Sequence, residues 1–273
     1  MSSTPSSTLD ASTVRAARER TKGQFIVTPT IQRPALSQLT GAETYVKYEN
    51  MQHTGAFKAR GAISKLTTLT DAQKKKGVIA MSAGNHAQGV AFHAKRLGIP
   101  ATIVMPEGTP FNKSTKTRDY GAEVVLEGEN FTECSAVTMR LAEERGLALV
   151  HPYNDNDVIA GQGVIGFEMI EAVPELDVIV VPVGGGGLIA GISLAAKSLK
   201  PEIDIVGVEP ELYPSMNNAL SGGDQPCGGS TVAEGAGAAA LAALLEYPEK
   251  FRGAKSASSF PAAISMHACF RPC

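Results

Sequence analysis

Residues 177–191 have the sequence DVIVVPVGGGGLIAG, in which an apolar β-branched run ends at four glycines and an apolar helical pattern begins. Glycines allow successive backbone N–H groups to point inward, and a following helix N-terminus adds partial positive charge. A tight strand–helix turn is the alternative, but four glycines lose much chain entropy on folding. Gly184, Gly185, Gly186 and Gly187 therefore predict a phosphate-binding loop. Since it is neither GxGxxG nor GxxxxGK[ST], the loop disfavours both NAD and ATP.

Elsewhere in the sequence, short apolar runs alternate with segments in which apolar residues recur at the spacing of a helix. Runs of this kind, several of them apolar on successive residues, indicate strands buried on both faces of parallel sheets that helices cover. The expected strands are 44–48, 78–81, 101–105, 123–126, 148–150, 178–183 and 205–208. The expected helices are 59–69, 86–97, 131–145, 159–172 and 188–197. The pattern predicts an α/β fold.

The strand–helix units fall into two groups. Residues 77–150 form a compact set that we expect to be a small domain. Residues 21–76 and 151–273 flank it in the sequence and predict a larger, discontinuous domain. Because Met1 to Asp10 is rich in serine and threonine, residues 1–20 are expected to be a disordered tail.

Composition narrows the range of partners. The chain has 273 residues, 43% hydrophobic and 19% charged, with a net charge of −2. This charge gives no sign of nucleic-acid binding, and no apolar run approaches the roughly 20 residues that span a bilayer. We expect no signal peptide. Neither the four cysteines nor the five histidines show metal-ligand spacing, so reduced thiols, a cytoplasmic location and no metal are predicted.

A second loop, Ser82-Ala83-Gly84-Asn85-His86, also lies between an expected strand and an expected helix. Small residues leave backbone N–H groups free, and the Asn85 side chain is both donor and acceptor. The loop could bind a carboxylate or a ring hydroxyl. A simple helix-capping turn explains much of the same composition, so both interpretations stay open on the residues alone.

A third segment, residues 50–60 (NMQHTGAFKAR), places Lys58 at the start of a helical pattern. A cation is electrostatically misplaced at a helix N-terminus. That position, a nearby phosphate and neighbouring Arg60 would favour the neutral amine, which is the form that makes Schiff bases. An ordinary surface lysine is the alternative, and without context it is the commoner case.

Together these segments resemble the fold type II pyridoxal-5'-phosphate (PLP) enzymes, most closely the serine/threonine dehydratases. The similarity runs from about residue 21 to about residue 217 and includes ENMQHTGAFKARGA, SAGNHAQGVA, HPYNDNDVIAGQGVIGFE and PVGGGGLIAG. It implies two open parallel-sheet domains of the tryptophan synthase β-subunit-like architecture. It also implies a Schiff base on Lys58, with Phe57 beside the ring, Asn85 on the ring hydroxyl and Gly184–Gly187 on the phosphate. The loop of Ser82, Ala83, Gly84 and His86 would bind the substrate carboxylate.

The resemblance implies β-elimination of water from L-threonine or L-serine, giving a 2-oxo acid and ammonia, in an enzyme expected to be a homodimer. Serine racemases of this fold carry a serine where this chain has Ala83, and racemisation needs a proton donor on each face. Alanine therefore favours elimination. Serine racemase, hydroxyaspartate dehydratase, an inactive truncated PLP-binding protein and an unrelated phosphate-binding domain are the alternatives.

The C-terminal part departs from the family pattern and is expected to be incomplete. CGGSTVAEGAGAAALAALL fuses two segments that the family separates by several elements, which alters the surroundings of Glu234. Residues 254–273 contain Pro261 and Pro272, lack the family's Ser-Gly-Gly-Asn turn and are not expected to form a buried strand. Glu209 has no clear acidic partner for an activating metal. We therefore predict a less stable and less active protein than an intact relative.

Overall fold

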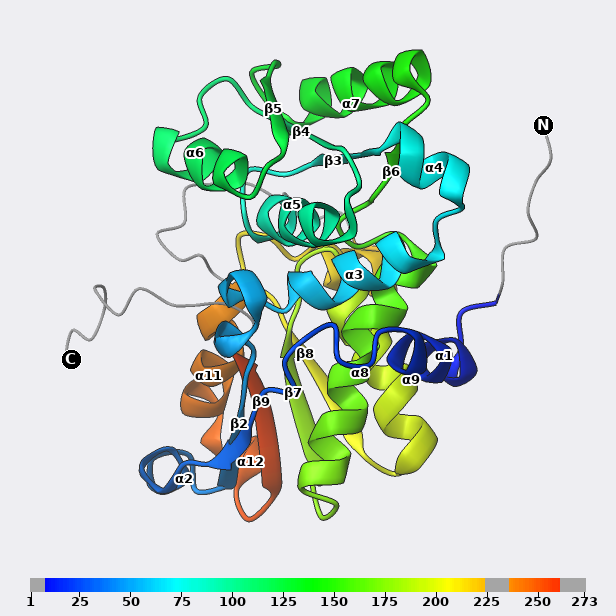
Figure 1. The fold of residues 1–273 in the computed structure, drawn as a ribbon. Helices are drawn as coiled ribbons and strands as arrows, with labels where there is room; N and C mark the ends of the chain where they lie inside the picture. The colour runs from blue at the N-terminus through cyan, green and yellow to red at the C-terminus, as the bar shows by residue number, and fades with distance from the viewer. Residues whose placement is uncertain (1–7, 224–235, 261–273) are drawn as a thin grey trace.

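The computed structural model describes residues 8–223 and 236–260. Its strands form two sheets (Figure 1), in the orders β1-β2-β9-β7-β8 and β5-β4-β3-β6. The strands of the first sheet are β1 (Thr30–Gln32), β2 (Glu43–Tyr48), β7 (Val178–Pro182), β8 (Asp204–Val208) and β9 (Lys255–Phe260). Those of the second are β3 (Val78–Met81), β4 (Ala101–Met105), β5 (Glu123–Leu126) and β6 (Ala148–Leu149). Every pairing is parallel except that of β1 with β2.

Helices cover both sheets, and this confirms the expected α/β class. The N-terminal helices are α1 (Ala11–Arg20), α2 (Pro34–Thr40), α3 (Lys58–Thr68) and α4 (Asp71–Lys76), with 3-10 turns at Glu49–Met51 and His53–Gly55. The middle helices are α5 (Asn85–Leu97), α6 (Phe111–Asp119), α7 (Phe131–Arg145), α8 (Asn156–Ala172) and α9 (Gly187–Leu199). The last ones are α10 (Ser215–Ser221), α11 (Ala236–Glu246) and α12 (Pro248–Phe251).

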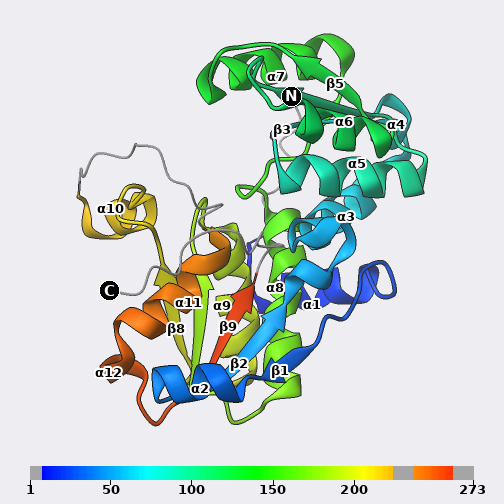
Figure 2. The same cartoon turned by 90° about the vertical axis from the view of Figure 1, so that its left-hand side faces the viewer.

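The two faces of the five-stranded sheet carry different helices. Figure 2 shows α1, α8 and α9 on one side and α2, α11 and α12 on the other. Helices α8 and α9 pack closely because glycines face each other: a Cβ on Gly163 would lie 2.7 Å from the carbonyl oxygen of Gly191. The core between this pair and the sheet includes Ile165, Ile179 and Ile192, none of which is exposed.

The four-stranded sheet lies within residues 77–150, and the five-stranded sheet takes its strands from both sides of that range. Helix α3 lies between the two sheets (Figure 1). Its Ala62 and Leu66 belong to the same buried cluster as Val78 of the smaller sheet. The domain boundaries expected from the sequence stay a prediction.

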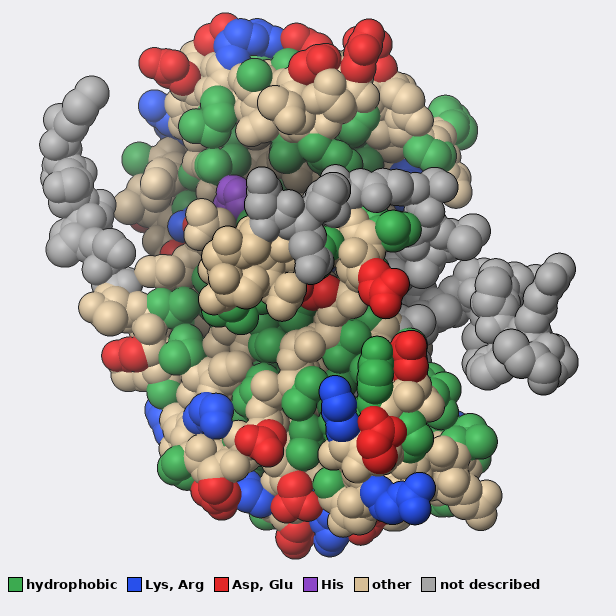
Figure 3. All heavy atoms as spheres, turned by 180° about the vertical axis from the view of Figure 1, so that it is seen from behind, with side chains coloured by type: hydrophobic (Ala, Val, Ile, Leu, Met, Phe, Trp, Pro, Cys, Tyr) green, Lys and Arg blue, Asp and Glu red, His purple; other side chains and the backbone are tan. Residues whose placement is uncertain are grey.

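The surface carries charges of both signs. Figure 3 shows acidic and basic side chains interspersed with hydrophobic ones on the face opposite to that of Figure 1. This mixture fits the small net charge of −2. Because charges of opposite sign lie close together, the described residues on this face produce no strong field of a single sign.

The expectation of a disordered tail over residues 1–20 is wrong for Ala11–Arg20, which form helix α1. Asp10 caps this helix in a capping box with Thr13. Val14 and Ala17 are fully buried against α8 and α9. An apolar stripe and a cap therefore hold the segment in place, although the residues before it are rich in serine and threonine.

The expectation that residues 254–273 form no buried strand is also wrong at its start. Lys255–Phe260 form β9, which lies in the middle of the five-stranded sheet and pairs in parallel with both β2 and β7. Ser256 and Ala257 are fully buried. Short side chains fit here because two flanking strands supply the hydrogen bonds, and Pro261 comes only after the last strand residue. Glu234 lies outside the described residues.

Candidate PLP site

Lys58 is the first residue of α3, and the sequence near it explains its position. The preceding 3-10 turn places Thr54 at a φ of 62° and Gly55 at 74°, so the chain reverses just before the helix. The Lys58 side chain is partly buried. Its ammonium donates a 2.7 Å hydrogen bond to the carbonyl oxygen of Pro152 and lies 5.1 Å from the Phe57 ring centroid.

Burial lowers the pKa of Lys58 from 10.5 to about 8. The cause is loss of hydration, which favours the neutral amine, and no carboxylate among the described residues pairs with Lys58. The sequence-based argument named Arg60 as a contributor, and the structure corrects that part. Arg60 points into the protein, where it bonds Glu49 and Glu168. With this pKa, about half of the Lys58 amine is neutral at pH 8, where it can act as a nucleophile or base.

The glycine loop joins β7 to α9, as the sequence predicts. Gly186 has a φ of 81° and caps α9 without a side-chain hydrogen bond. Among the described residues, the amides of Gly184, Gly185, Gly186 and Gly187 meet no hydrogen-bond acceptor. Unpaired amides at the start of a thirteen-residue helix form a suitable cradle for an anion.

Close packing explains why side chains are excluded from this loop. A Cβ on Gly185 would lie 2.2 Å from the Tyr153 ring, and one on Gly187 would lie 2.8 Å from the Tyr153 carbonyl oxygen. A Cβ on Gly184 would meet open space. The loop is thus held against Tyr153 on one side and stays accessible on another.

The second loop joins β3 to α5. The Ser82 hydroxyl accepts a 3.1 Å hydrogen bond from the Gly84 amide. Within the part of the chain that the structure describes, the amides of Asn85, His86 and Ala87 have no acceptor. Ala83 packs against the apolar cluster of the smaller sheet. The loop therefore offers a second set of free donors, as required for a carboxylate.

His86 is deeply buried, and its Nε2 lies 2.9 Å from the carbonyl oxygen of Val150. Burial, with a smaller contribution from Lys58, lowers its pKa to about 3. The ring is therefore neutral near pH 7. If Nε2 carries the proton, Nδ1 is an acceptor that has no partner among the described residues.

Residues 151–153 connect two of the predicted segments, the Lys58 segment and the glycine loop. Pro152 accepts the hydrogen bond of Lys58, Tyr153 contacts the glycine loop, and the His151 and Tyr153 rings meet edge to face at 4.7 Å. On the other side, helix α5 approaches the backbone of Lys58 so closely that a Cβ on Gly89 would lie 3.2 Å from its carbonyl carbon. Sequence reasoning gave residues 151–153 no role, because a backbone carbonyl carries no residue-type signal.

Glu209 is not arranged as a metal ligand in this structure. Its carboxylate accepts hydrogen bonds from the amides of Met216 and Asn217 and from the Ser215 hydroxyl. It therefore caps the start of α10. Across residues 8–223 and 236–260, no group of three or more His, Cys, Asp or Glu side chains could hold a metal ion. None of the described helices is long and apolar enough to cross a membrane.

Two features define the class of protein: the α/β fold, and a lysine of lowered pKa near two loops with amides that can bind anions. Both are typical of PLP enzymes. Comparison with known proteins agrees: the family model of pyridoxal-phosphate dependent enzymes matches residues 22–231. The chain belongs to this family, and PLP is its cofactor.

Curated relatives extend the comparison. The chain is 52% identical over 202 residues to L-threonine ammonia-lyase of Thermotoga maritima, covering 73% of this chain and 50% of that protein. It is 55% identical over 185 residues to the catabolic L-threonine dehydratase TdcB of Staphylococcus aureus, covering 67% and 54%. The chain thus spans about half the length of the curated relatives it matches.

Solved structures show the same fold. Maize serine racemase matches with a TM-score of 0.88 and 30% identity, covering 94% of both chains. The processed form of threonine deaminase isoform 2 from Solanum lycopersicum matches with a TM-score of 0.84 and 30% identity, covering 94% of this chain and 84% of that one. The expected fold type II architecture is confirmed.

Proposed function

We propose that this chain is a PLP-dependent dehydratase that converts L-threonine or L-serine to a 2-oxo acid and ammonia by β-elimination of water. One observation carries the proposal: a lysine with a pKa lowered to about 8 lies beside two loops whose amides have no acceptor among the described residues. The names of the relatives above support this choice of reaction and of substrate class.

The residues present fit the cofactor. Lys58 would hold it covalently, Gly184–Gly187 would bind its phosphate, and Asn85 would bond the ring hydroxyl with Phe57 beside the ring. When bound, PLP supplies an electron sink for the negative charge that develops at the substrate α-carbon. The amides at the glycine loop and the N-terminus of α9 would offset the phosphate charge.

Lys58 would also take the α-proton from the substrate. Its neutral amine is abundant near pH 8, so Nζ can accept the α-proton of the substrate. The resulting ammonium can return a proton to the departing hydroxyl. The Pro152 carbonyl oxygen, 2.7 Å from Nζ, stabilises the charged form between these steps.

The loop of residues 82–86 would bind the substrate carboxylate. The amides of Asn85 and His86 at the N-terminus of α5, which have no acceptor among the described residues, suit an anion. The neutral His86 ring contributes no charge to this binding. Holding the carboxylate fixes the orientation of the α-hydrogen toward Lys58. Ala83 supplies no proton donor on the opposite face, so elimination is favoured over racemisation.

The experiment is borohydride reduction of the purified protein with PLP, followed by intact mass and peptide mapping. Turnover of L-threonine and L-serine and chiral analysis of the amino acid are measured in parallel. An adduct confined to Lys58 together with 2-oxo acid supports the proposal. An adduct without turnover identifies an inactive PLP-binding protein, and D-serine formation identifies a racemase. The homodimer and the cytoplasmic location stay predictions.

A further inference from the structure

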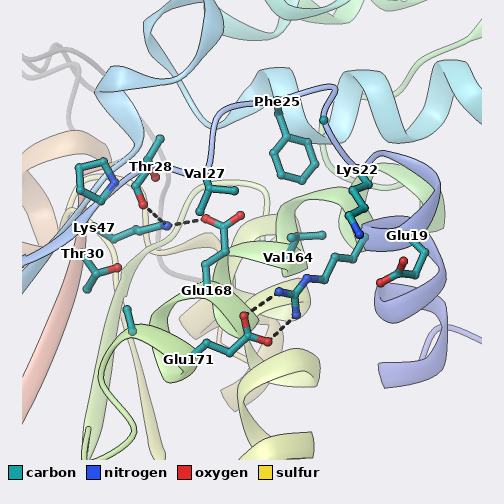
Figure 4. A pocket seen from close by; sticks show the side chains of 14 residues that line it. Glu19, Lys22, Phe25, Val27, Thr28, Thr30, Lys47, Val164, Glu168 and Glu171 are labelled. Carbon is teal, nitrogen blue, oxygen red and sulfur yellow. Dashed lines mark hydrogen bonds and ion pairs between the residues drawn. The ribbon is translucent and has the colours of Figure 1, made fainter.

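The cavity next to α1 and α8 carries balanced charges. It has a volume of about 620 Å³ and lies between α1, β1, β2 and α8, with Thr30 and Lys47 among its lining residues. Figure 4 shows Lys47 bonded to Glu168 there. The charged side chains of the lining are Glu19, Glu168 and Glu171 on the one hand and Arg18, Lys22 and Lys47 on the other, so their charge selects no ligand. A different arrangement lies beside Lys58, where a titratable ring has backbone amides as its partners.

The side chain of His151 closes a tight turn over residues 151–154. Its Nδ1 accepts hydrogen bonds from the amides of Asn154 at 2.8 Å and of Tyr153 at 3.3 Å. These two amides have no other acceptor among the described residues, and Pro152 has no N–H. Asparagine and aspartate oxygens commonly close turns in this way. An imidazole differs because it titrates between about pH 5 and 8.

The same turn contacts two parts of the site around Lys58. The Pro152 carbonyl oxygen accepts the 2.7 Å hydrogen bond from Lys58 Nζ. The Tyr153 ring lies against the glycine loop, where a Cβ on Gly185 would come within 2.2 Å of it. The rings of His151 and Tyr153 also meet edge to face, with their centroids 4.7 Å apart. A change in the turn therefore alters the surroundings of the lysine and of the glycine loop together.

The groups around His151 keep its ring neutral near pH 7. Burial lowers the pKa of His151 from its ordinary value of 6.5, Asp155 before α8 opposes this in part, and Lys58 of α3 lowers the pKa further. His86 of α5 also faces the ring, and its own pKa of about 3 leaves it uncharged. A neutral ring whose Nδ1 is an acceptor carries its proton on Nε2. A proton added at Nδ1 would turn this acceptor into a donor that faces two amide donors.

We propose that His151 is a positioning residue, whose unprotonated Nδ1 holds the turn that presents the Pro152 carbonyl oxygen to Lys58 and the Tyr153 ring to the glycine loop. When Nδ1 gains a proton, the two amides lose their acceptor, the turn opens and water reaches Lys58. Because loss of hydration is what lowers the pKa of Lys58, the amine then titrates more like an ordinary lysine. The role rests on the proposed function in that Lys58 is taken as the cofactor lysine.

The test compares two substitutions at His151 in the whole chain. His151→Asn is the matched control, because its amide oxygen is as many bonds from the backbone as Nδ1, accepts hydrogen bonds and does not titrate. His151→Phe keeps a ring beside Tyr153 and removes the acceptor. The rate of Lys58 modification by an amine-reactive reagent is followed against pH by peptide mass, in protein without PLP. Half-maximal modification is expected near pH 8 in the parent and in His151→Asn, and about one pH unit or more higher in His151→Phe.

Binding of PLP gives a second measurement on the same proteins. PLP should bind about tenfold more weakly to His151→Phe than to His151→Asn, because the glycine loop has lost its support at Tyr153. The His151 ring is neutral at pH 8, so loss of a charge does not account for either difference.

An NMR titration of the parent tests the proposal even if His151→Phe does not fold. The amide signals of Tyr153 and Asn154 should shift with the same midpoint as the His151 ring, below pH 6.5, and should not shift over that range in His151→Asn. Separate midpoints for ring and amides, an unchanged Lys58 midpoint in folded His151→Phe, or an equal rise in His151→Asn would each overturn the proposal. Failure of the parent to turn over threonine would instead count against the proposed function, since none of these measurements uses turnover.

Discussion

Lys58 and Arg60 leave the same turn of α3 toward two different environments. Loss of hydration is the largest influence on both side chains, yet the outcomes are opposite. Lys58 meets one carbonyl oxygen and its pKa falls to about 8. Arg60 meets two carboxylates, Glu49 and Glu168, which raise its pKa above the ordinary value despite burial. At Arg60 the two carboxylates therefore outweigh the loss of hydration, whereas at Lys58 the loss of hydration is the cause that lowers the pKa.

Arg60 and Lys47 form a buried ion cluster with Glu49 and Glu168. Its guanidinium binds Glu49 at 2.7 and 2.8 Å and Glu168 at 2.7 and 2.8 Å, and it lies 4.6 Å from the Phe25 ring centroid. Lys47 also binds Glu168. Because this cluster joins α3 to α8 and to the segment before β1, it fixes the direction in which the opposite face of α3 presents Lys58.

Replacing Lys58 should give the largest effect on activity. Lys58→Ala should lose the reducible PLP adduct and lower turnover of threonine by roughly 10³-fold or more, because the proposed base is gone. Its melting temperature should change little. Lys75→Ala, on the exposed part of α4, is the control. Retention of the adduct at a specific position in Lys58→Ala would contradict the assignment.

Replacing Arg60 should mainly lower the stability of the fold. Arg60→Met leaves Glu49 and Glu168 buried without their main partner and should lower the free energy of unfolding by about 3–5 kcal/mol, measured by urea denaturation. Arg60→Lys keeps the charge and should lose less. A change below about 1 kcal/mol in Arg60→Met would show that the cluster does not hold the start of α3.

The pH dependence of Lys58 sharpens the contrast with ordinary lysines, which titrate near 10.4. The rate of Lys58 modification by an amine-reactive reagent, followed by peptide mass in the protein without PLP, should be half-maximal near pH 8. The folded state binds fewer protons than the unfolded state between about 8 and 10.5. The contribution of Lys58 to stability should therefore rise with pH across that window, and it is lost as pH falls through 8. Half-maximal modification above pH 10 would refute this.

Replacing Ser256, a buried polar residue without charge, should give the smallest effect on stability. It is a third case to set beside Lys58 and Arg60. Its hydroxyl is buried in β9 and has no partner among the described residues. Ser256→Ala removes this unsatisfied group and should leave stability unchanged or raise it by about 1 kcal/mol, measured by thermal denaturation. A clear loss of stability would indicate that the hydroxyl has a hydrogen-bond partner.

Much of the fold follows from local sequence. The runs 78–81, 101–105 and 123–126 form strands with the predicted bounds, and 131–145 forms the predicted helix. The glycine loop and the loop of residues 82–86 lie between a strand and a helix as expected. Lys58 begins a helix, as its sequence context indicates. These features depend on side-chain periodicity and on glycine conformations, which neighbouring residues determine.

Tertiary structure decided the rest. A central strand of mainly small residues at Lys255–Phe260 has no apolar signal, because its place depends on β2 and β7 on either side. Arg60 meets Glu168 across 108 positions of sequence, and the cavity at Thr30 and Lys47 needs α1, β1, β2 and α8 together. The sequence alone thus determined the family, the cofactor and the lysine expected to hold it. Burial and long-range charge pairing determined which buried cation is reactive, since both depend on partners that are distant along the chain.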